Sequence, residues 1–343
     1  MSDYGPGARL LYRLALGNPA LAELSLDLQR RLAPGDPVAA ARGRHVFVTG
    51  LARAGTTIVM RRLHASGAFR SLTYADMPFV LAPTLWARLG GARRPAAPAA
   101  ERAHGDGIRV GLHSPEALDE VFWRVKCGRD YIRETCLVPH APGDETVEAF
   151  VTYVASILHG DGGGRRYLSK NNNNILRLPA IRRAFPQAVI LVPFRHPLDQ
   201  AASLRAQHLR FRRLQAGDRF VLRYMRYLAH HEFGRDHRPF RFAGAPAPGA
   251  APEEIEYWLE VWCAAHEWLL GQSGCAITPL CYDRLVEDPR RWARVAELAG
   301  TDEPPDGAEE LKRRPPSPRP AADRALLARA EEIYRTLGAR SMV

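Results

Sequence analysis

Lysine and cysteine are scarce in this chain. Three of its 48 basic residues are lysines, and all the others are arginines. The five cysteines are scattered and never form a C-x-x-C pair, which argues against a disulfide framework or a zinc site and fits a reducing compartment. No apolar run approaches 18 residues, and the first residues lack the pattern of a signal peptide. We therefore expect a cytoplasmic protein without a transmembrane segment.

Negative charge is also in short supply, because 37 acidic residues face the 48 basic ones and leave a formal net charge of +11. This excess suits a polyanionic partner, and nucleic acid, an anionic membrane surface and a nucleotide all qualify. A genome rich in G and C explains the many arginines equally well. The length and the hydrophobic content of 46% are those of one large folded domain.

Short apolar strands alternate with helical patterns along the chain. Buried strands are expected at three apolar, largely β-branched runs, residues 45–50, 188–192 and 277–282. Apolar spacing and start signals predict helices at residues 8–32, 57–63, 147–158, 197–231, 255–270 and 322–337. Another helix is expected to begin with Ser114 as its N-cap and Pro115 as its first residue. Strands separated by helices predict an α/β fold with a mostly parallel central sheet flanked by helices.

The expected domain organisation has two parts. Residues 1–43 are expected to form an N-terminal helical extension, and residues 44–343 a single domain. Segments rich in Gly, Pro and Ala predict lid-like insertions into this domain near residues 83–113 and 211–253. Loops of this kind set the specificity of a binding site.

A glycine-containing turn, Gly50 to Thr57, follows the first expected strand and precedes a helix. Its glycines allow backbone N–H groups to point into one concavity, and the helix N-terminus adds its positive dipole end. The spacing matches the phosphate loop G-x-x-x-x-G-K-S/T, except that Thr56 stands at the lysine position. The turn therefore predicts an oxyanion cradle rather than a nucleoside triphosphate site, with Arg53 adding positive charge. A glycine turn without a ligand is the structural alternative.

A second candidate anchor follows the strand expected at residues 188–192. Arg195 would emerge at the carboxyl end of this strand, where ligands bind in open α/β sheets. Ser203 follows eight residues later, about two helical turns into the next helix, and can donate to the same ligand. The planar guanidinium suits bidentate contact with a dianionic phosphate. The alternative for Arg195 alone is a surface ion pair.

Both anchors resemble motifs of sulfotransferases that use 3′-phosphoadenosine-5′-phosphosulfate (PAPS), in the style of tyrosylprotein and bacterial carbohydrate-type members. Arg53-Ala54-Gly55-Thr56-Thr57 is similar to the family's 5′-phosphosulfate loop, K/R-S/A-G-T-T. The segment from Phe194 to Ser203 is similar to its 3′-phosphate site. The resemblance extends over about residues 44–300. It implies a P-loop-like three-layer fold and transfer of a sulfuryl group from PAPS to an acceptor hydroxyl or amine, releasing adenosine 3′,5′-bisphosphate.

Two further segments add supporting resemblance. The stretch ending in Ser169-Lys170-Asn171-Asn172 is similar to the family's K-x-P motif, whose lysine reaches the bridging oxygen of the phosphosulfate. This implies that Lys170 replaces the lysine missing from the loop, although asparagine occupies the proline position. Tyr282 lies in a segment similar to Y-E/D-x-L-V-x-x-P and is implied to lie near the nucleotide, with a core tyrosine as the alternative. The four asparagines at 171–174 favour a capped turn over a set of substrate donors.

The reaction needs a general base for the acceptor proton, and the first choice is Asp76. It follows the loop helix by about the interval at which tyrosylprotein-type relatives place a catalytic glutamate. A turn or helix cap is an equal alternative for this residue. The other candidates are His104, Asp106, Glu116 and Glu120, of which the two glutamates are expected on one, by default solvated, helical face. The spacing of the histidines at 230–237 lacks the H-E-x-x-H pattern, so no metal is expected.

Two other functions stay open. A P-loop kinase shares the strand, loop and helix but is disfavoured by Thr56 and by the lack of an evident acidic Walker-B strand. A nucleic-acid-binding module would use the net charge of +11, although the basic residues show no repeated interleaving with aromatic ones. No motif names the acceptor, so a carbohydrate, a lipid and a small metabolite all remain open.

Overall fold

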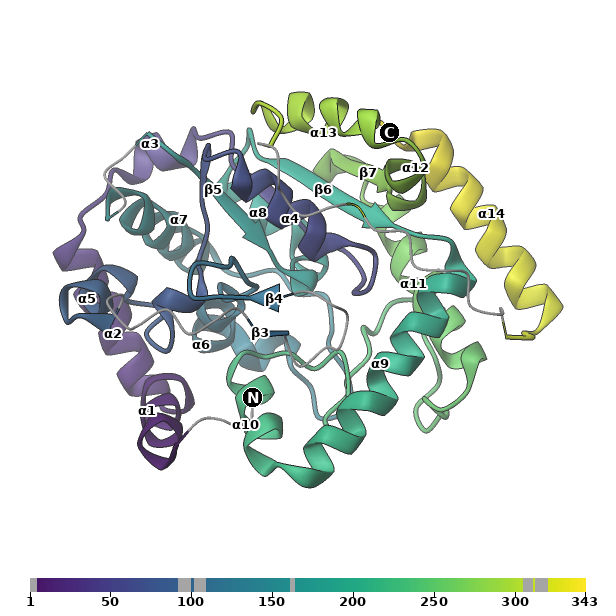
Figure 1. Ribbon diagram of the computed structural model, residues 1–343, viewed down its shortest axis with the longest axis horizontal. Coiled ribbons are helices and arrows are strands. Elements are labelled where there is room, and N and C mark those ends of the chain that lie inside the picture. Colours follow the sequence, from purple (N-terminus) through teal and green to yellow (C-terminus); the bar gives the residue numbers. More distant parts are fainter. Residues whose placement is uncertain (1–4, 92–99, 102–108, 161–163, 305–310, 312–319) are drawn as a thin grey trace.

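The computed structural model (Figure 1) describes residues 5–91, 100–101, 109–160, 164–304, 311 and 320–343. A parallel five-stranded sheet forms its centre, in the spatial order β2-β5-β1-β6-β7. The strands of this sheet are β1 (Val46–Val48), β2 (Phe69–Arg70), β5 (Arg166–Lys170), β6 (Val189–Phe194) and β7 (Ile277–Cys281). A separate antiparallel pair consists of β3 (Ala100–Glu101) and β4 (Arg109–Val110). The α/β fold predicted from the alternation of strands and helices is confirmed.

Helices connect the strands and surround the sheet (Figure 1). The α-helices are α1 (Pro6–Gly17), α2 (Pro19–Leu32), α3 (Pro37–Ala41), α4 (Thr56–Ala65), α5 (Pro83–Arg88), α6 (Glu120–Tyr131), α7 (Asp144–His159), α8 (Leu178–Ala184), α9 (Pro197–Gly217), α10 (Arg219–Tyr227), α11 (Ile255–Leu270), α12 (Tyr282–Glu287), α13 (Trp292–Ala299) and α14 (Arg324–Arg340). Short 3₁₀ turns include η1 (Tyr74–Asp76) and η3 (Asn172–Leu176). Among the described helices, none is long and apolar enough to cross a membrane.

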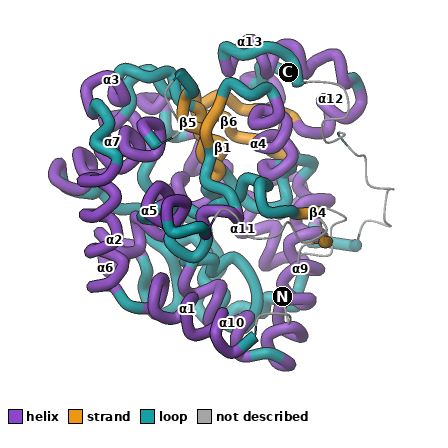
Figure 2. Tube along the Cα trace, turned by 60° about the vertical axis from the view of Figure 1, so that its left-hand side comes forward, coloured by secondary structure: helices purple, strands orange, loops and turns teal. Residues whose placement is uncertain are grey.

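The sheet separates two apolar layers, because successive side chains of a strand point to opposite faces. On one face Val46 and Val48 of β1 pack with Val59 and Leu63 of α4 and with residues of α12 and α13. On the other face Phe47 of β1 joins a larger cluster formed with α6, α7, α8, α9 and α11. Figure 2 shows α4 on one side of the strands and α7 on the other. The result is a three-layer arrangement of helices, sheet and helices.

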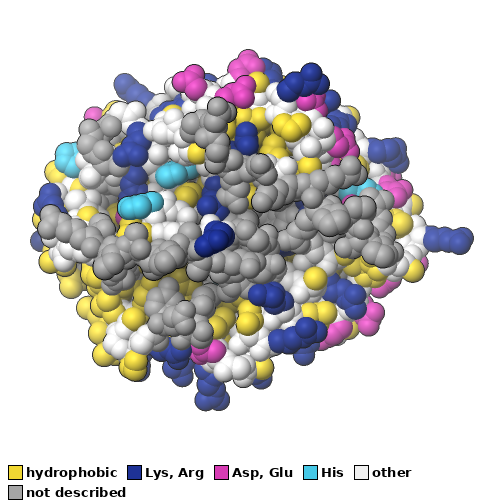
Figure 3. All heavy atoms as spheres, in the orientation of Figure 1, with side chains coloured by type: hydrophobic (Ala, Val, Ile, Leu, Met, Phe, Trp, Pro, Cys, Tyr) yellow, Lys and Arg dark blue, Asp and Glu magenta, His cyan; other side chains and the backbone are white. Residues whose placement is uncertain are grey.

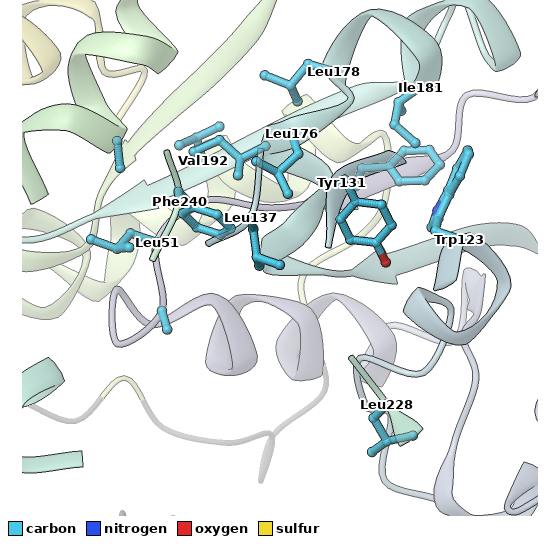
Figure 4. Close-up of a cluster of buried hydrophobic side chains, with 14 of the residues drawn as sticks. Leu51, Trp123, Tyr131, Leu137, Leu176, Leu178, Ile181, Val192, Leu228 and Phe240 are labelled. Atoms are coloured by element: carbon cyan, nitrogen blue, oxygen red, sulfur yellow. The ribbon is translucent and has the colours of Figure 1, made fainter. Parts of the chain in front are cut away.

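The larger cluster reaches from the helices to the loop that follows β1. Figure 4 shows Leu176, Leu178 and Ile181 of η3 and α8 near Trp123 and Tyr131 of α6. The same close-up shows two further members of this cluster, Leu51 in the loop after β1 and Val192 in β6. The backbone after β1 is therefore anchored in the core through an apolar side chain.

The N-terminal helices pack on the same core. Leu16 of α1 and Leu26 of α2 are buried in the larger cluster. Gln29 of α2 is fully buried, and its amide donates to the Thr84 hydroxyl at 2.9 Å and accepts from the Thr84 N–H at 3.0 Å. The helical prediction for residues 8–32 is confirmed, as α1 and α2.

One helix prediction was wrong. Pro115 does not begin a helix, because it forms an isolated antiparallel bridge with Thr73. The helix that follows, α6, begins only at Glu120. A serine followed by a proline is compatible with extended backbone as well as with the start of a helix. The bridge to Thr73, which is distant in sequence, favours the extended conformation here. The lid-like insertion expected near residues 83–113 lies partly outside the described residues.

Candidate active site

The loop between β1 and α4 has three residues with positive φ, namely Gly50, Arg53 and Gly55. Gly55 caps α4 with φ of 86°, and Arg53 adopts φ of 68°, which is uncommon for a residue with a Cβ atom. A Cβ atom at Gly55 would lie 2.3 Å from Cδ2 of Tyr282. Glycine is therefore required both by the backbone conformation and by the ring packed against it. The start of α12 thus lies directly against the loop.

A buried amide holds this loop in place. Gln200 of α9 is fully buried, and its Nε2 donates to the carbonyl of Ala52 at 2.9 Å and to that of Leu51 at 3.4 Å. Its Oε1 accepts from the indole of Trp262 at 3.0 Å and from the backbone N–H of Arg195 at 3.3 Å. One side chain therefore ties the loop after β1 to the residue that follows β6.

The two candidate anchors lie side by side. Arg53 Nε donates to Ser203 Oγ at 3.1 Å, and Arg195 Nη1 contacts the carbonyl of Arg53 at 3.5 Å. The Arg195 guanidinium lies 5.9 Å from the centroid of the Tyr282 ring. Candidate residues as far apart in the sequence as Arg53 and Tyr282 thus lie close together at the carboxyl edge of the sheet.

Asp283 positions the second anchor. Its Oδ1 lies 3.7 Å from Arg195 Nε, and its Oδ2 accepts from the N–H of His196 at 2.7 Å. The hydroxyl of Tyr334 on α14 donates to the same Oδ2 at 3.1 Å. The ion pair considered as the alternative for Arg195 exists, but it lies inside the cluster of candidate residues, and the arginine side chain is 17% exposed.

Lys170 ends β5 beside the start of the loop. Its register partner is Val48, the last residue of β1, and it shares a sheet face with Leu168, which packs towards α4. Thr49 closes the gap between the two strand ends, because its hydroxyl donates to the carbonyl of Asn171 at 2.8 Å. Lys170 is 9% exposed, so its ammonium group is largely removed from bulk water.

The four asparagines after Lys170 form the capped turn that was predicted. Asn171 caps η3, with its side chain accepting from the N–H of Asn173 at 3.0 Å. Its Nδ2 donates to Glu120 Oε2 at 2.7 Å. Asn172 Nδ2 donates to Glu232 Oε1 at 3.2 Å. All four asparagines are buried, so their side chains fix the backbone around the end of β5.

Asp76 sits in a capping box with Thr73 at the start of η1. Its Oδ2 accepts from the Thr73 N–H at 2.7 Å, and its Oδ1 accepts from Arg70 Nη2 at 2.9 Å. Both carboxylate oxygens therefore have donors, which is the arrangement of the capping alternative. A role as base stays a prediction. His104 and Asp106, two other candidates for the base, lie outside the described residues.

The expected helical face with Glu116 and Glu120 was wrong, because Glu116 precedes α6 and both side chains are buried. Glu120 forms a bidentate ion pair with Arg177, with N···O distances of 2.7 and 3.0 Å, and also accepts from the Tyr131 hydroxyl. Despite the opposing effect of burial, these partners hold the pKa of Glu120 below its usual value. Glu116 accepts from the Tyr74 hydroxyl at 3.2 Å.

Several residues near the candidate site had not been identified from the sequence. Burial raises the pKa of Asp119 to about 6, although Ser169 of β5 donates to it at 2.6 Å. Gln200 lies within the segment similar to the 3′-phosphate site, and Asp283 occupies the E/D position of the tyrosine motif, but neither had been assigned a role. The contacts that give them one join segments distant in sequence. The described part of the chain contains no group of three His, Cys, Asp or Glu residues placed to hold a metal ion.

A known protein family matches this chain. The profile of the Sulfotransferase family matches residues 45–243, more than half of the chain. No protein of curated function matches the chain. Among solved structures, sulfotransferase STF9 from Mycobacterium avium is 15% identical with a TM-score of 0.47, covering 98% of this chain and 79% of that one. Sulfotransferase STF1 from Mycobacterium tuberculosis H37Rv is 14% identical with a TM-score of 0.46, covering 84% and 75%. From the family match, we conclude that the chain belongs to the sulfotransferase family.

Proposed function

We propose that the chain transfers a sulfuryl group from PAPS to an acceptor hydroxyl or amine and releases adenosine 3′,5′-bisphosphate. The observation that carries this proposal is the contact of 3.1 Å between Arg53 Nε of the loop and Ser203 Oγ of α9. Because the two anchors touch, one nucleotide with phosphates at both ends can contact both of them. The family match supports the reaction class.

The loop holds the 5′ end of the nucleotide in this proposal. The backbone N–H groups around Ala54 and Gly55 and the hydroxyls of Thr56 and Thr57 bind the phosphosulfate, at the positively polarised start of α4. Arg195 and Ser203 bind the 3′-phosphate. The guanidinium offers two parallel N–H donors to phosphate oxygens, and the hydroxyl adds a third. Tyr282, packed against Gly55, lies beside the nucleotide.

Sulfuryl transfer then follows as an in-line displacement. The acceptor oxygen or nitrogen forms a bond to sulfur while the bond from sulfur to the bridging phosphate oxygen breaks. Negative charge grows on that oxygen, and Arg53, Thr57 and Lys170 stabilise it. Lys170 ends β5 beside the loop, where it supplies the ammonium charge that the loop lacks at Thr56. The acceptor proton passes to the general base, for which Asp76 is the proposed residue.

The acceptor is held by the insertions in this proposal. We assign the lid function to residues 83–113 and 211–253, which are inserted into the domain of residues 44–343. Residues 1–43, whose helices pack on α7 and α10, form the helical extension. Glu232, in the second insertion, contacts Asn172 two residues after Lys170, which brings this segment close to the reacting end of the nucleotide.

A calorimetric titration tests the nucleotide specificity. Adenosine 3′,5′-bisphosphate is expected to bind tightly, and ATP weakly, because Thr56 replaces the phosphate-loop lysine. In Arg195→Ala the bisphosphate affinity should fall by about tenfold to hundredfold, since a charge-assisted contact of roughly 1.5–3 kcal/mol is lost. The matched control is Arg219→Ala, an exposed arginine on α10, which should bind as the unaltered protein does.

Two outcomes would reverse the proposal. Tighter binding of ATP than of the bisphosphate would favour a P-loop kinase. Salt-sensitive binding of DNA with no bisphosphate binding would favour a nucleic-acid-binding protein. On the face drawn in Figure 3, described Lys and Arg side chains occur together with Asp and Glu side chains.

A further inference from the structure

A second cavity lies away from the candidate nucleotide site, between α9, residues 234–253 and the first turn of α11. Its volume is about 810 Å³. Its α9 residues begin at His208 and continue to Ala216, so they lie between about one and four turns beyond Ser203 along the helix. Arg53, Arg195 and Ser203 do not line it. The cavity therefore does not overlap with the two anchors, although most of its lining lies in residues 211–253.

The described lining of this cavity is strongly basic. It contains the guanidinium groups of Arg212, Arg213, Arg235 and Arg241 and a single carboxylate, Glu253. Glu253 forms an ion pair with Arg212, which neutralises one of the four positive charges. The side chains of Arg213 and Arg235 make no hydrogen bond or ion pair within the described part of the chain, so their charges have no partner there. The cavity consequently holds about three uncompensated positive charges.

A buried histidine adds a donor to the wall. His208 lines the cavity and is 2% exposed. Its Nδ1 accepts from the N–H of Gly234 at 3.3 Å, which places the proton of the neutral ring on Nε2. Nε2 has no hydrogen-bond partner among the described residues. Burial, together with the charge of Arg212, lowers the pKa of His208 to about 4, because both effects disfavour a second proton on the ring.

From this combination we infer that the cavity binds a small polyanion, a molecule with two or more phosphate, sulfate or carboxylate groups. The volume lies within the range of about 300–1,000 Å³ that is usual for small-molecule sites. Guanidinium groups bind such oxyanions through paired N–H donors, and His208 Nε2–H supplies a neutral donor beside them. The anion removes the repulsion among the arginines that line the empty cavity. This site is additional to the proposed nucleotide site and does not depend on it.

The test uses inorganic pyrophosphate as the probe, and the Arg195→Ala variant provides the background in which binding at the nucleotide site is weakened. Calorimetry of the full chain should show saturable binding of one pyrophosphate at 0.15 M salt. Arg213→Ala and Arg235→Ala remove exposed side chains and should leave folding intact, yet each should weaken pyrophosphate binding by tenfold or more. The matched control, Arg219→Ala, removes an exposed arginine of α10 that does not line the cavity and should leave the affinity unchanged.

Two further measurements sharpen the result. Citrate in place of pyrophosphate distinguishes a carboxylate site from a phosphate site, and either one supports a polyanion site. Proton NMR of the imidazoles should show the pKa of His208 rising when the probe binds, since an anion stabilises the protonated ring. Absence of saturable binding for both probes, or equal losses in Arg213→Ala and Arg219→Ala, would overturn the inference. Arg195→Ala should bind pyrophosphate normally, so failure of this site and failure of the proposed function are distinguishable.

Discussion

At the scale of single residues, position 55 requires glycine for two independent reasons. Its φ of 86° disfavours any side chain, and the Tyr282 ring fills the space a Cβ atom would need. We expect Gly55→Ala to displace the ring or the loop and to weaken adenosine 3′,5′-bisphosphate binding by at least about tenfold. Calorimetric titration of the purified variant measures this loss.

Gly67 offers a matched control for that substitution. It has φ of 77°, yet a Cβ atom there would meet nothing within 4 Å. Gly67→Ala therefore carries a similar backbone cost, of the order of 1 kcal/mol, without the steric conflict. Equal loss of nucleotide binding in the two variants would show that the Tyr282 contact is irrelevant to the site.

Asp76 combines two possible roles that one substitution can separate. In Asp76→Asn the remaining side-chain oxygen still accepts from the Thr73 N–H, so the cap at η1 is retained. The amide cannot take up the acceptor proton, so kcat should fall by about a hundredfold or more, while the melting temperature should fall only by the amount that the lost ion pair with Arg70 accounts for. A variant with nearly full kcat would assign Asp76 to capping alone. Initial-rate kinetics and thermal unfolding supply the two readings.

At the scale of elements, Gln200 couples α9 to the loop after β1. Gln200→Leu would leave the carbonyl of Ala52, the N–H of Arg195 and the indole of Trp262 without their buried partner. We expect the KM for the nucleotide to rise at least tenfold, because both anchors lose their common support. The KM for the acceptor should change much less.

Gln207 provides the control for that experiment on the same helix. It is 5% exposed, and its Nε2 has no hydrogen-bond partner among the described residues. Gln207→Leu thus changes a buried glutamine of α9 that does not contact the loop. If Gln207→Leu raised the KM for the nucleotide as much as Gln200→Leu, the effect would reflect a general disturbance of α9.

The elements that could be predicted from sequence are those whose pattern is local. Apolar runs indicated β1, β6 and β7, and helical spacing indicated α11 with its bounds. β5 was not predicted because Arg166, Ser169 and Lys170 interrupt its apolar pattern. β2 was not predicted because it is only two residues long. The start of α6 was missed because Pro115 forms a bridge with Thr73, 42 positions away, and does not begin a helix.

The candidate site divides in the same way. The loop and the Arg195 and Ser203 pair were found because ligand contact requires fixed local spacings. Gln200 and Asp283 support those residues through contacts between distant segments, and only the folded chain brings them together. Motifs thus indicated which groups can meet a ligand, whereas packing determined what holds them in position.

At the scale of the whole molecule, buried neutral histidines make stability depend on pH. His45, His208 and His266 are at most 2% exposed, and burial lowers the pKa of each to about 4. The unfolded chain binds a proton at each of these positions below about pH 6.5, before the folded protein does. Their contribution to stability is therefore complete above pH 6.5 and is lost as the pH falls towards 4.

Asp119 opposes this trend, because its pKa is raised to about 6 and the folded protein holds its proton more tightly than the unfolded chain. Its destabilising effect is largest above pH 6 and diminishes as the pH falls towards 4. The histidines outweigh this carboxyl group, and the lowered pKa values of His64, His140 and His237 act in the same direction, so the free energy of unfolding should decrease by several kcal/mol between pH 7 and pH 5. Urea denaturation at the two pH values measures the difference. Equal stability at both would contradict the assignment of buried, neutral histidines.

The scarcity of lysine gives Lys170 a further property. Reagents that acylate primary amines do not react with guanidinium groups, so the 45 arginines of this chain are not modified by them. Only three lysine side chains can react, and one of them ends β5 next to the phosphate-type loop. Its rate of acylation reports on the end of β5 beside the loop, and a nucleotide bound as proposed would lower that rate.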